Sequence, residues 1–299
     1  MSQPGTAPGT TRSRLAPAAA ALALFAASSC AGAAPAPETQ EALALETRRD
    51  LGSGYTIELV EDLFVVAANT DRDGVEEGKS TVRRAYHALM RSFFETKPER
   101  PIAVYLFRDK RTYEDYCVRR YGEKPSTPYG FFQPTERKLV MNIATGSGTL
   151  VHELVHPLLA ADFPSVPPWL NEGMASLYEM CQITSDRIVG CVNWRLPYLQ
   201  EAVEKKTLIP LRDLVAMPTG EFYRRYSVPY AESRYLCMYL QEKDLLVRFY
   251  KAFRAAAKEA DPAKKDATGA ATLEAVTGKK LEDLQAEWLA WVATLRWNR

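Results

Sequence analysis

Two histidines and a glutamate stand close together near the middle of the chain, in Val151-His152-Glu153-Leu154-Val155-His156. On an α-helix, residues four apart lie on one face with Cβ atoms roughly 5–6 Å apart, so both imidazoles can reach one zinc ion. Glu153 would lie beside that ion without binding it. There its carboxylate can take a proton from a water that the metal acidifies and pass it to a leaving amine. The chain has three histidines in all, and two of them occupy this motif.

A catalytic zinc site needs a third protein ligand and a fourth position that stays open for water. Downstream of the histidines the chain reads Trp169-Leu170-Asn171-Glu172-Gly173-Met174-Ala175. This segment closely resembles the Trp-Leu-Asn-Glu-Gly-Phe-Ala segment of the aminopeptidase-N-like gluzincins and of the wider peptidase-MA-like families. The resemblance implies that Glu172 is the third zinc ligand. It also implies that Glu179 orients a ligand histidine, although an ordinary solvated glutamate fits that position equally well.

Two helices must position these groups. Residues 146–149 read Gly-Ser-Gly-Thr, which ends a strand and offers a cap for the helix that carries the motif. Residues 162–168 contain three prolines and can reverse the chain, so that a second helix over residues 169–178 crosses the first. Pro157 follows His156 directly, and we expect it to kink the first helix because it removes a hydrogen bond.

The oxyanion of peptide hydrolysis needs a hydrogen-bond donor besides the metal. In the aminopeptidase-like gluzincins a tyrosine downstream of the third ligand has this role, and Tyr226, Tyr230 and Tyr235 are the candidates here. We choose Tyr230, because it follows Pro229 where a helix can begin; a packing role would explain it equally well. The chain lacks the Gly-Ala-Met-Glu-Asn motif of exopeptidases, which favours an endopeptidase.

Strand patterns gather in the first half of the chain and helical patterns in the second. β-rich runs stand at residues 55–60, 63–68, 102–107, 129–132 and 138–143, and helical spacing at residues 75–94 and 110–121. From Pro197 onward the pattern is mainly helical. The order predicts an α+β fold. The resemblance implies a zincin-like domain with an N-terminal mixed sheet and a mostly helical C-terminal part.

The chain divides into three parts. Residues 1–34 are expected to be a leader, residues 35–53 a linker, and residues 54–299 one gluzincin-like catalytic domain, in which residues 54–125 also fit a small N-terminal α/β lobe. Within that domain we expect residues 138–142 to form an edge strand along which an extended peptide lies. Residues 55–121 and 273–291 resemble peptidase-MA-like proteins more weakly.

The leader resembles a secretory signal. Arg12 and Arg14 precede a small apolar run, and no acidic residue occurs before Glu38. Cys30 follows Ala-Ser-Ser, which resembles a bacterial lipobox and implies lipid anchoring; cleavage after the small residues 31–33 would instead release a soluble protein. Both routes predict export to the bacterial cell envelope or beyond.

Four further cysteines, Cys117, Cys181, Cys191 and Cys237, fit two disulfides in an exported chain or four buried thiols. We prefer a Cys181–Cys191 pair, because the polar stretch between them can close as a hairpin. Lys+Arg 38 against Asp+Glu 37 gives a net charge of +1, which argues against a nucleic-acid partner.

The sequence thus predicts zinc-dependent hydrolysis of peptide bonds in a peptide or protein substrate. Two other functions stay open: a catalytically degenerate gluzincin that acts as an envelope binding lipoprotein, and a zinc hydrolase of non-peptide amides or esters. The remaining histidine, His87, is expected to be a helix-surface or partly buried residue without a catalytic role.

Overall fold

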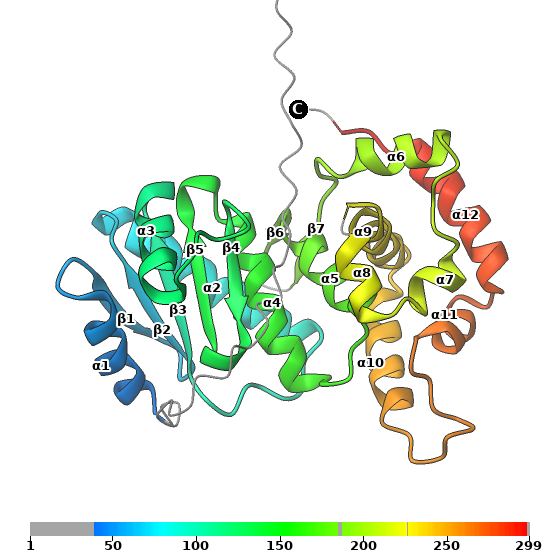
Figure 1. Cartoon of the computed structure of the whole chain (residues 1–299). Helices are drawn as coiled ribbons and strands as arrows, with labels where there is room; N and C mark the ends of the chain where they lie inside the picture. The colour runs from blue at the N-terminus through cyan, green and yellow to red at the C-terminus, as the bar shows by residue number, and fades with distance from the viewer. Residues whose placement is uncertain (1–38, 185–186, 226, 298–299) are drawn as a thin grey trace, which may run out of the picture.

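A mixed sheet fills the N-terminal half of the protein, and helices make up the C-terminal half (Figure 1). The computed structural model describes residues 39–184, 187–225 and 227–297. The α+β class is therefore confirmed. The leader at residues 1–34, with Cys30, lies outside the described residues.

The strands are β1 Thr56–Val60, β2 Phe64–Ala68, β3 Ile102–Phe107, β4 Gly130–Gln133, β5 Lys138–Asn142, β6 Cys181–Ile183 and β7 Ile188–Gly190. The helices are α1 Gln40–Leu51, α2 Arg72–Ser92, α3 Lys110–Tyr121, α4 Gly148–Asp162, α5 Pro168–Tyr178, α6 Leu196–Glu204, α7 Leu211–Val215, α8 Thr219–Arg225, α9 Ser227–Glu242, α10 Leu246–Ala257, α11 Ala270–Thr277 and α12 Leu281–Thr294. Among these helices, none combines the length and the apolar character needed to cross a membrane.

The larger sheet has the order β1-β2-β3-β5-β4, with its three central strands parallel and each outer strand antiparallel to its neighbour. Successive residues of a strand point to opposite faces. The register row of Val66, Val104 and Leu139 therefore packs under α2 and α4, whereas the neighbouring row of Ala67, Tyr105 and Val140 packs under α1 and α3. Both faces are covered, which explains why β2, β3 and β5 are buried at every position.

The two edges of this sheet are β1 and β4, and β4 lies beside α4; β5 is an inner strand, because it lies between β3 and β4. The prediction that residues 138–142 form the edge strand is therefore wrong. Strand order depends on which distant segments pair, and two neighbouring β-rich runs do not reveal which of them is outermost.

Helix α1 occupies residues 40–51, which is most of the segment that was predicted to be a linker, so that prediction is wrong there. Leu43 and Leu51 are buried against the sheet. Asp50 accepts hydrogen bonds from the hydroxyl of Tyr105 at 3.0 Å and from Nζ of Lys138 at 3.1 Å. The apolar face of α1 is narrow and its other residues are mostly charged, which is why its composition suggested a linker.

Helix α5 packs closely on α9, which brings the second half of the chain to the motif helix. A Cβ atom at Gly173 would lie 2.8 Å from both the Ser233 carbonyl oxygen and the Cys237 sulfur, so a larger residue would push the helices apart. Gly173 thus permits a close approach of the α5 and α9 backbones.

The hairpin predicted between Cys181 and Cys191 is present as β6 and β7. The disulfide is not, because all four described cysteines are free thiols. Cys181 faces Gly190 across the hairpin, and the backbone N–H of Cys191 donates to the carbonyl of Met180. The two cysteines are therefore not directly opposite one another.

Candidate metal centre

Helix α4 holds His152, Glu153 and His156 together on its buried side. One ligand atom from each residue lies within 4.8 Å of the others, and the imidazole rings stand edge to face with centroids 5.1 Å apart. All three side chains are buried. The helix continues through Pro157 to Asp162, so the proline leaves the four-residue spacing of the histidines intact. This group could hold a metal ion.

Glu172 on α5 reaches the same place. It is fully buried, and its Oε2 lies 3.6 Å from Nε2 of His152. Its other oxygen, Oε1, accepts a hydrogen bond from the hydroxyl of Tyr223 at 3.0 Å. The carboxylate therefore turns one oxygen toward the histidines and the other toward α8.

The second nitrogen of each imidazole is also engaged. Nδ1 of His156 donates to Oδ1 of Asn171 at 3.0 Å, which leaves the lone pair on Nε2 for a metal. His152 interacts with the backbone carbonyl of Ala175. Sequence reasoning did not assign Asn171 a role, although it stands next to Glu172 in the quoted segment. It also missed Tyr223, which lies far along the chain in a short helix with no motif.

Several polar atoms in this centre have no hydrogen-bond partner although they are buried. They are Oε2 of Glu153, Nε2 of His156, Oε2 of Glu172 and the hydroxyl of Tyr230. Leaving one such atom unsatisfied costs about 1–3 kcal/mol, so a cluster of them favours a bound ion or ordered water that completes their hydrogen bonding. Two carboxylate oxygens and an imidazole nitrogen fit a cation, and the site has the donor set of a metal centre.

Burial sets the protonation of these groups. It lowers the pKa of His152 well below its usual value, helped by the electrostatic effect of the neighbouring His156 and Arg195, so this imidazole stays neutral and free to bind a metal. Burial raises the pKa of Glu153 well above its usual value, and the nearby negative charge of Glu172 adds to the effect. Burial also raises the pKa of Glu172, against opposing interactions with His156 and Tyr223.

Of the three candidate tyrosines, Tyr230 lies in the centre. It is 3% exposed, and burial together with the charges of Glu172 and Glu153 raises its pKa. Tyr235 lies elsewhere, because its hydroxyl donates to the backbone carbonyl of Asn193 and accepts from the backbone N–H of the same residue. Tyr226 lies outside the described residues.

Glu179 does not orient a histidine. It forms an ion pair with Arg195, whose guanidinium stacks on the Trp194 ring 4.1 Å from its centroid. The expected orienting role is taken by Asn171 instead. His87 is exposed, in agreement with the surface position predicted for it, and its Nε2 lies 3.1 Å from Oε2 of Glu61.

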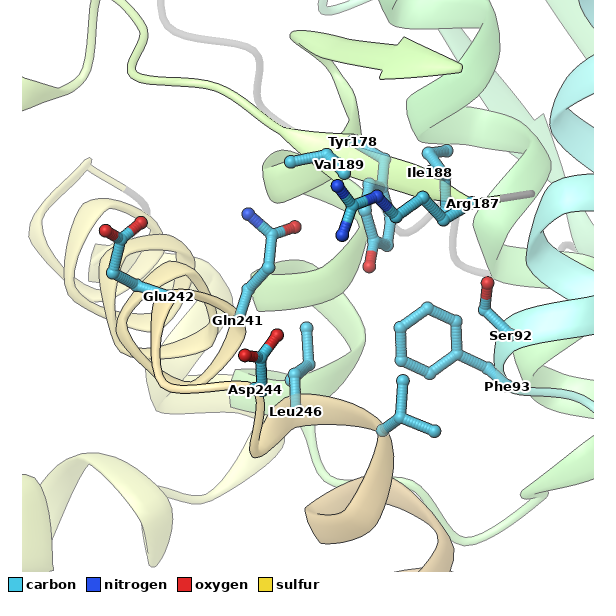
Figure 2. Close-up of a pocket in the computed structure, with 11 residues that line it drawn as sticks. Ser92, Phe93, Tyr178, Arg187, Ile188, Val189, Gln241, Glu242, Asp244 and Leu246 are labelled. Atoms are coloured by element: carbon cyan, nitrogen blue, oxygen red, sulfur yellow. The ribbon is translucent and has the colours of Figure 1, made fainter. Parts of the chain in front are cut away.

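A cavity of about 320 Å³ lies near the hairpin of β6 and β7, and Figure 2 shows the side chains that line it. Its walls come from Ser92 and Phe93 at the end of α2, from Arg187, and from Gln241 and Leu246 beside the junction of α9 and α10. None of its lining residues belongs to the metal centre. The cavity is therefore separate from the histidine motif.

No model of a known protein family matches the chain, and a search of curated proteins finds no match either. The functional argument therefore rests on the residues of this centre.

Proposed function

We propose that this protein is a zinc-dependent peptidase of the gluzincin type. One observation carries the proposal: Oε2 of Glu153, Nε2 of His156 and Oε2 of Glu172 are buried without hydrogen-bond partners, and Oε2 of Glu172 lies 3.6 Å from Nε2 of His152 in the neighbouring His-Glu-x-x-His group. A protein fold tolerates such a cluster where a ligand completes it. A metal ion held by two imidazoles and a carboxylate accounts for these atoms together.

His152, His156 and Glu172 are the proposed ligands. Two neutral imidazoles with one carboxylate form a donor set that suits zinc and leaves a position open. When bound, the ion polarises the carbonyl of the scissile bond and makes water more acidic. The hydrogen bonds from His156 to Asn171 and from Tyr223 to Glu172 orient two of these ligands.

Glu153 is the proposed general base. Its carboxylate takes a proton from the attacking water and delivers it to the nitrogen of the departing amine, so it is unchanged after one turnover. The raised pKa of Glu153 suits both steps, because a group that shuttles protons works best when its pKa lies near the working pH.

Tyr230 is the proposed donor to the oxyanion. Its buried hydroxyl has no hydrogen-bond partner of good geometry in the described part of the chain, and its raised pKa keeps the proton on the oxygen. A neutral hydroxyl that is already oriented can stabilise the negative charge that forms on the carbonyl oxygen as the water attacks.

The open edge of β4 is the proposed position of the peptide. In an antiparallel pair, alternate residues turn their backbone groups to the neighbouring strand. Tyr129 accepts from the N–H of Asn142, so Gly130 and Phe132 turn theirs outward, and the backbone of Phe132 interacts with Glu153. An extended peptide can add to this edge as a further strand next to the general base. Such binding needs no free peptide terminus, which favours an endopeptidase.

The resemblance of residues 1–34 to a secretory signal supports export to the bacterial envelope. The protein would be either a lipoprotein anchored through Cys30 or a released protein. The substrate would then be a peptide or protein of that compartment. Comparing membrane and soluble fractions of cells that express the chain with those that express Cys30→Ser separates the two routes.

Metal analysis combined with unbiased peptide cleavage tests the function. We expect one zinc per chain and internal cleavage of peptides, which Glu153→Gln abolishes while the metal remains bound. Bound zinc without any hydrolysis would instead support a binding protein. Hydrolysis of esters or simple amides alone would support a non-peptide hydrolase.

A further inference from the structure

The two oxygens of the Glu172 carboxylate have different surroundings. Oε1 accepts the hydroxyl proton of Tyr223 at 3.0 Å, whereas Oε2 lies 3.6 Å from Nε2 of His152 and has no hydrogen-bond partner. A carboxylate can bind a metal through one oxygen or through both. With Oε1 engaged by a phenol, Oε2 is the oxygen that remains for an ion.

Tyr223 and Tyr230 share this corner of the centre but differ in what their hydroxyl groups do. Their rings stand edge to face with centroids 6.4 Å apart. Tyr230 is buried, and its hydroxyl interacts with Glu172 but forms no hydrogen bond of good geometry, whereas Tyr223 is half-buried and its hydroxyl donates to Glu172 at 3.0 Å. The first hydroxyl is available to a substrate, and the second is occupied by a ligand residue.

The Tyr223 hydroxyl also interacts with the side-chain amide of Asn171. That amide accepts the Nδ1 hydrogen of His156. The contacts therefore run without a break from His156 through Asn171 and Tyr223 to Glu172. A single hydroxyl supports two proposed ligands on different helices.

We propose that Tyr223 is a positioning residue, which holds Glu172 so that Oε2 alone binds the metal. This inference rests on the proposed metal site. Its consequence is that the coordination position next to Oε2 stays open for water, which a catalytic zinc site requires. Without the hydroxyl, the carboxylate is free to rotate and the chain of contacts to Asn171 is broken.

The test compares zinc affinities by chelator competition in the full chain and in three Tyr→Phe variants. Removing an outer group that orients a metal ligand typically lowers affinity about 10–100-fold, and we expect a loss of this size in Tyr223→Phe. Tyr230→Phe should keep the wild-type affinity and lose turnover. Tyr235→Phe is the matched control, because it removes a bonded hydroxyl outside the centre and should keep the affinity.

Activity at rising zinc concentration gives a second readout. Tyr223→Phe should regain most of its turnover when zinc is saturating, whereas Tyr230→Phe should not, because its defect is not in metal binding. Wild-type zinc affinity in a folded Tyr223→Phe protein would overturn the inference and leave the metal site itself standing. If the wild-type chain binds no zinc, both this inference and the proposed metal site are wrong.

Discussion

The two ends of helix α4 both carry buried carboxylates, and the protein treats them in opposite ways. At the C-terminal end, Asp162 is fully buried and surrounded by donors. It accepts the backbone N–H groups of Glu95 at 2.9 Å and Thr96 at 2.8 Å, the hydroxyl of Tyr250 at 2.6 Å, and the Arg254 guanidinium at 2.6 Å. One turn beyond its start, the same helix leaves Glu153 with an unpartnered oxygen.

This difference fits a structural role for Asp162 and the proposed catalytic role of Glu153. Burial alone would raise the pKa of Asp162, but the hydrogen bonds outweigh it and hold that pKa below the usual value. Burial raises the pKa of Glu153, and the neighbouring Glu172 adds to the shift. The Asp162 cluster is complete as folded and ties α4 to α10 and to the end of α2. The centre around Glu153 is complete only when something binds.

The largest expected effect is on catalysis. Glu153→Gln keeps the size of the side chain and removes the base, so we expect a fall in turnover of about 10²–10⁴-fold. Steady-state cleavage of a peptide found in the library screen measures it. Turnover within twofold of wild type would mean that Glu153 is not the base.

Breaking the hydrogen-bond cluster around Asp162 should lower the stability of the protein rather than its turnover. Asp162→Ala removes a buried acceptor and leaves the Arg254 guanidinium with Glu95 alone, and we expect a loss of about 1–3 kcal/mol in the free energy of unfolding. Urea denaturation measures it, with Asp261→Ala at an exposed ion pair as the control. Because the pKa of Asp162 is lowered, its contribution is present above the unfolded pKa and disappears as the pH falls through the folded value. The wild type and Asp162→Ala should therefore converge in stability at acid pH.

The buried carboxylate of Glu232 on α9 is hydrogen-bonded to an extent between that of Asp162 and that of Glu153. It is fully buried, Oε1 accepts the N–H of Ile209 at 2.9 Å, and Oε2 has no partner. Burial raises its pKa to about 8, so the folded state keeps a proton that the unfolded chain releases at lower pH. Between the two pKa values, this group costs about 1.4 kcal/mol of stability for each unit of rising pH. Glu232→Gln should remove that slope in urea denaturation at pH 5–8, and an unchanged slope would contradict the assignment.

The smallest expected effect is a gain in the free energy of unfolding, whereas Asp162→Ala is expected to cause a loss. In the metal-free protein, Glu153→Gln removes the unfavourable interaction between the carboxylates of Glu153 and Glu172 and keeps a polar side chain of the same size. We expect a gain of about 1 kcal/mol in the free energy of unfolding. Destabilisation by this substitution in chelated protein would show that the centre is a structural cluster like that of Asp162.

Local patterns predicted much of the fold. Strand Ile102–Phe107 and helix Lys110–Tyr121 have the predicted bounds, because Pro101 precedes an uninterrupted apolar run, Asp109 caps the helix and Gly122 ends it. The positions of His152, Glu153 and His156 followed from helical spacing alone. Their burial did not, because it depends on how α5 and β4 pack around them.

The features of the fold and the site that could not be predicted from the sequence depend on contacts between distant segments. The order of β4 and β5, the docking of α1 on the sheet and the contact between Tyr223 and Glu172 each join residues that no local pattern relates. A short helix such as α8 has no periodicity strong enough to single out Tyr223. The Cys181–Cys191 pairing failed for a similar reason, because spacing can suggest a hairpin but does not fix which side chains face each other across it.

Zinc binding to ligand variants tests the central claim most directly. Equilibrium dialysis of the wild-type chain should give one zinc per chain, and His152→Ala, His156→Ala and Glu172→Ala should each lose it while remaining folded. Wild-type zinc binding in folded Glu172→Ala would contradict the account, because the two helices would then not share one ion.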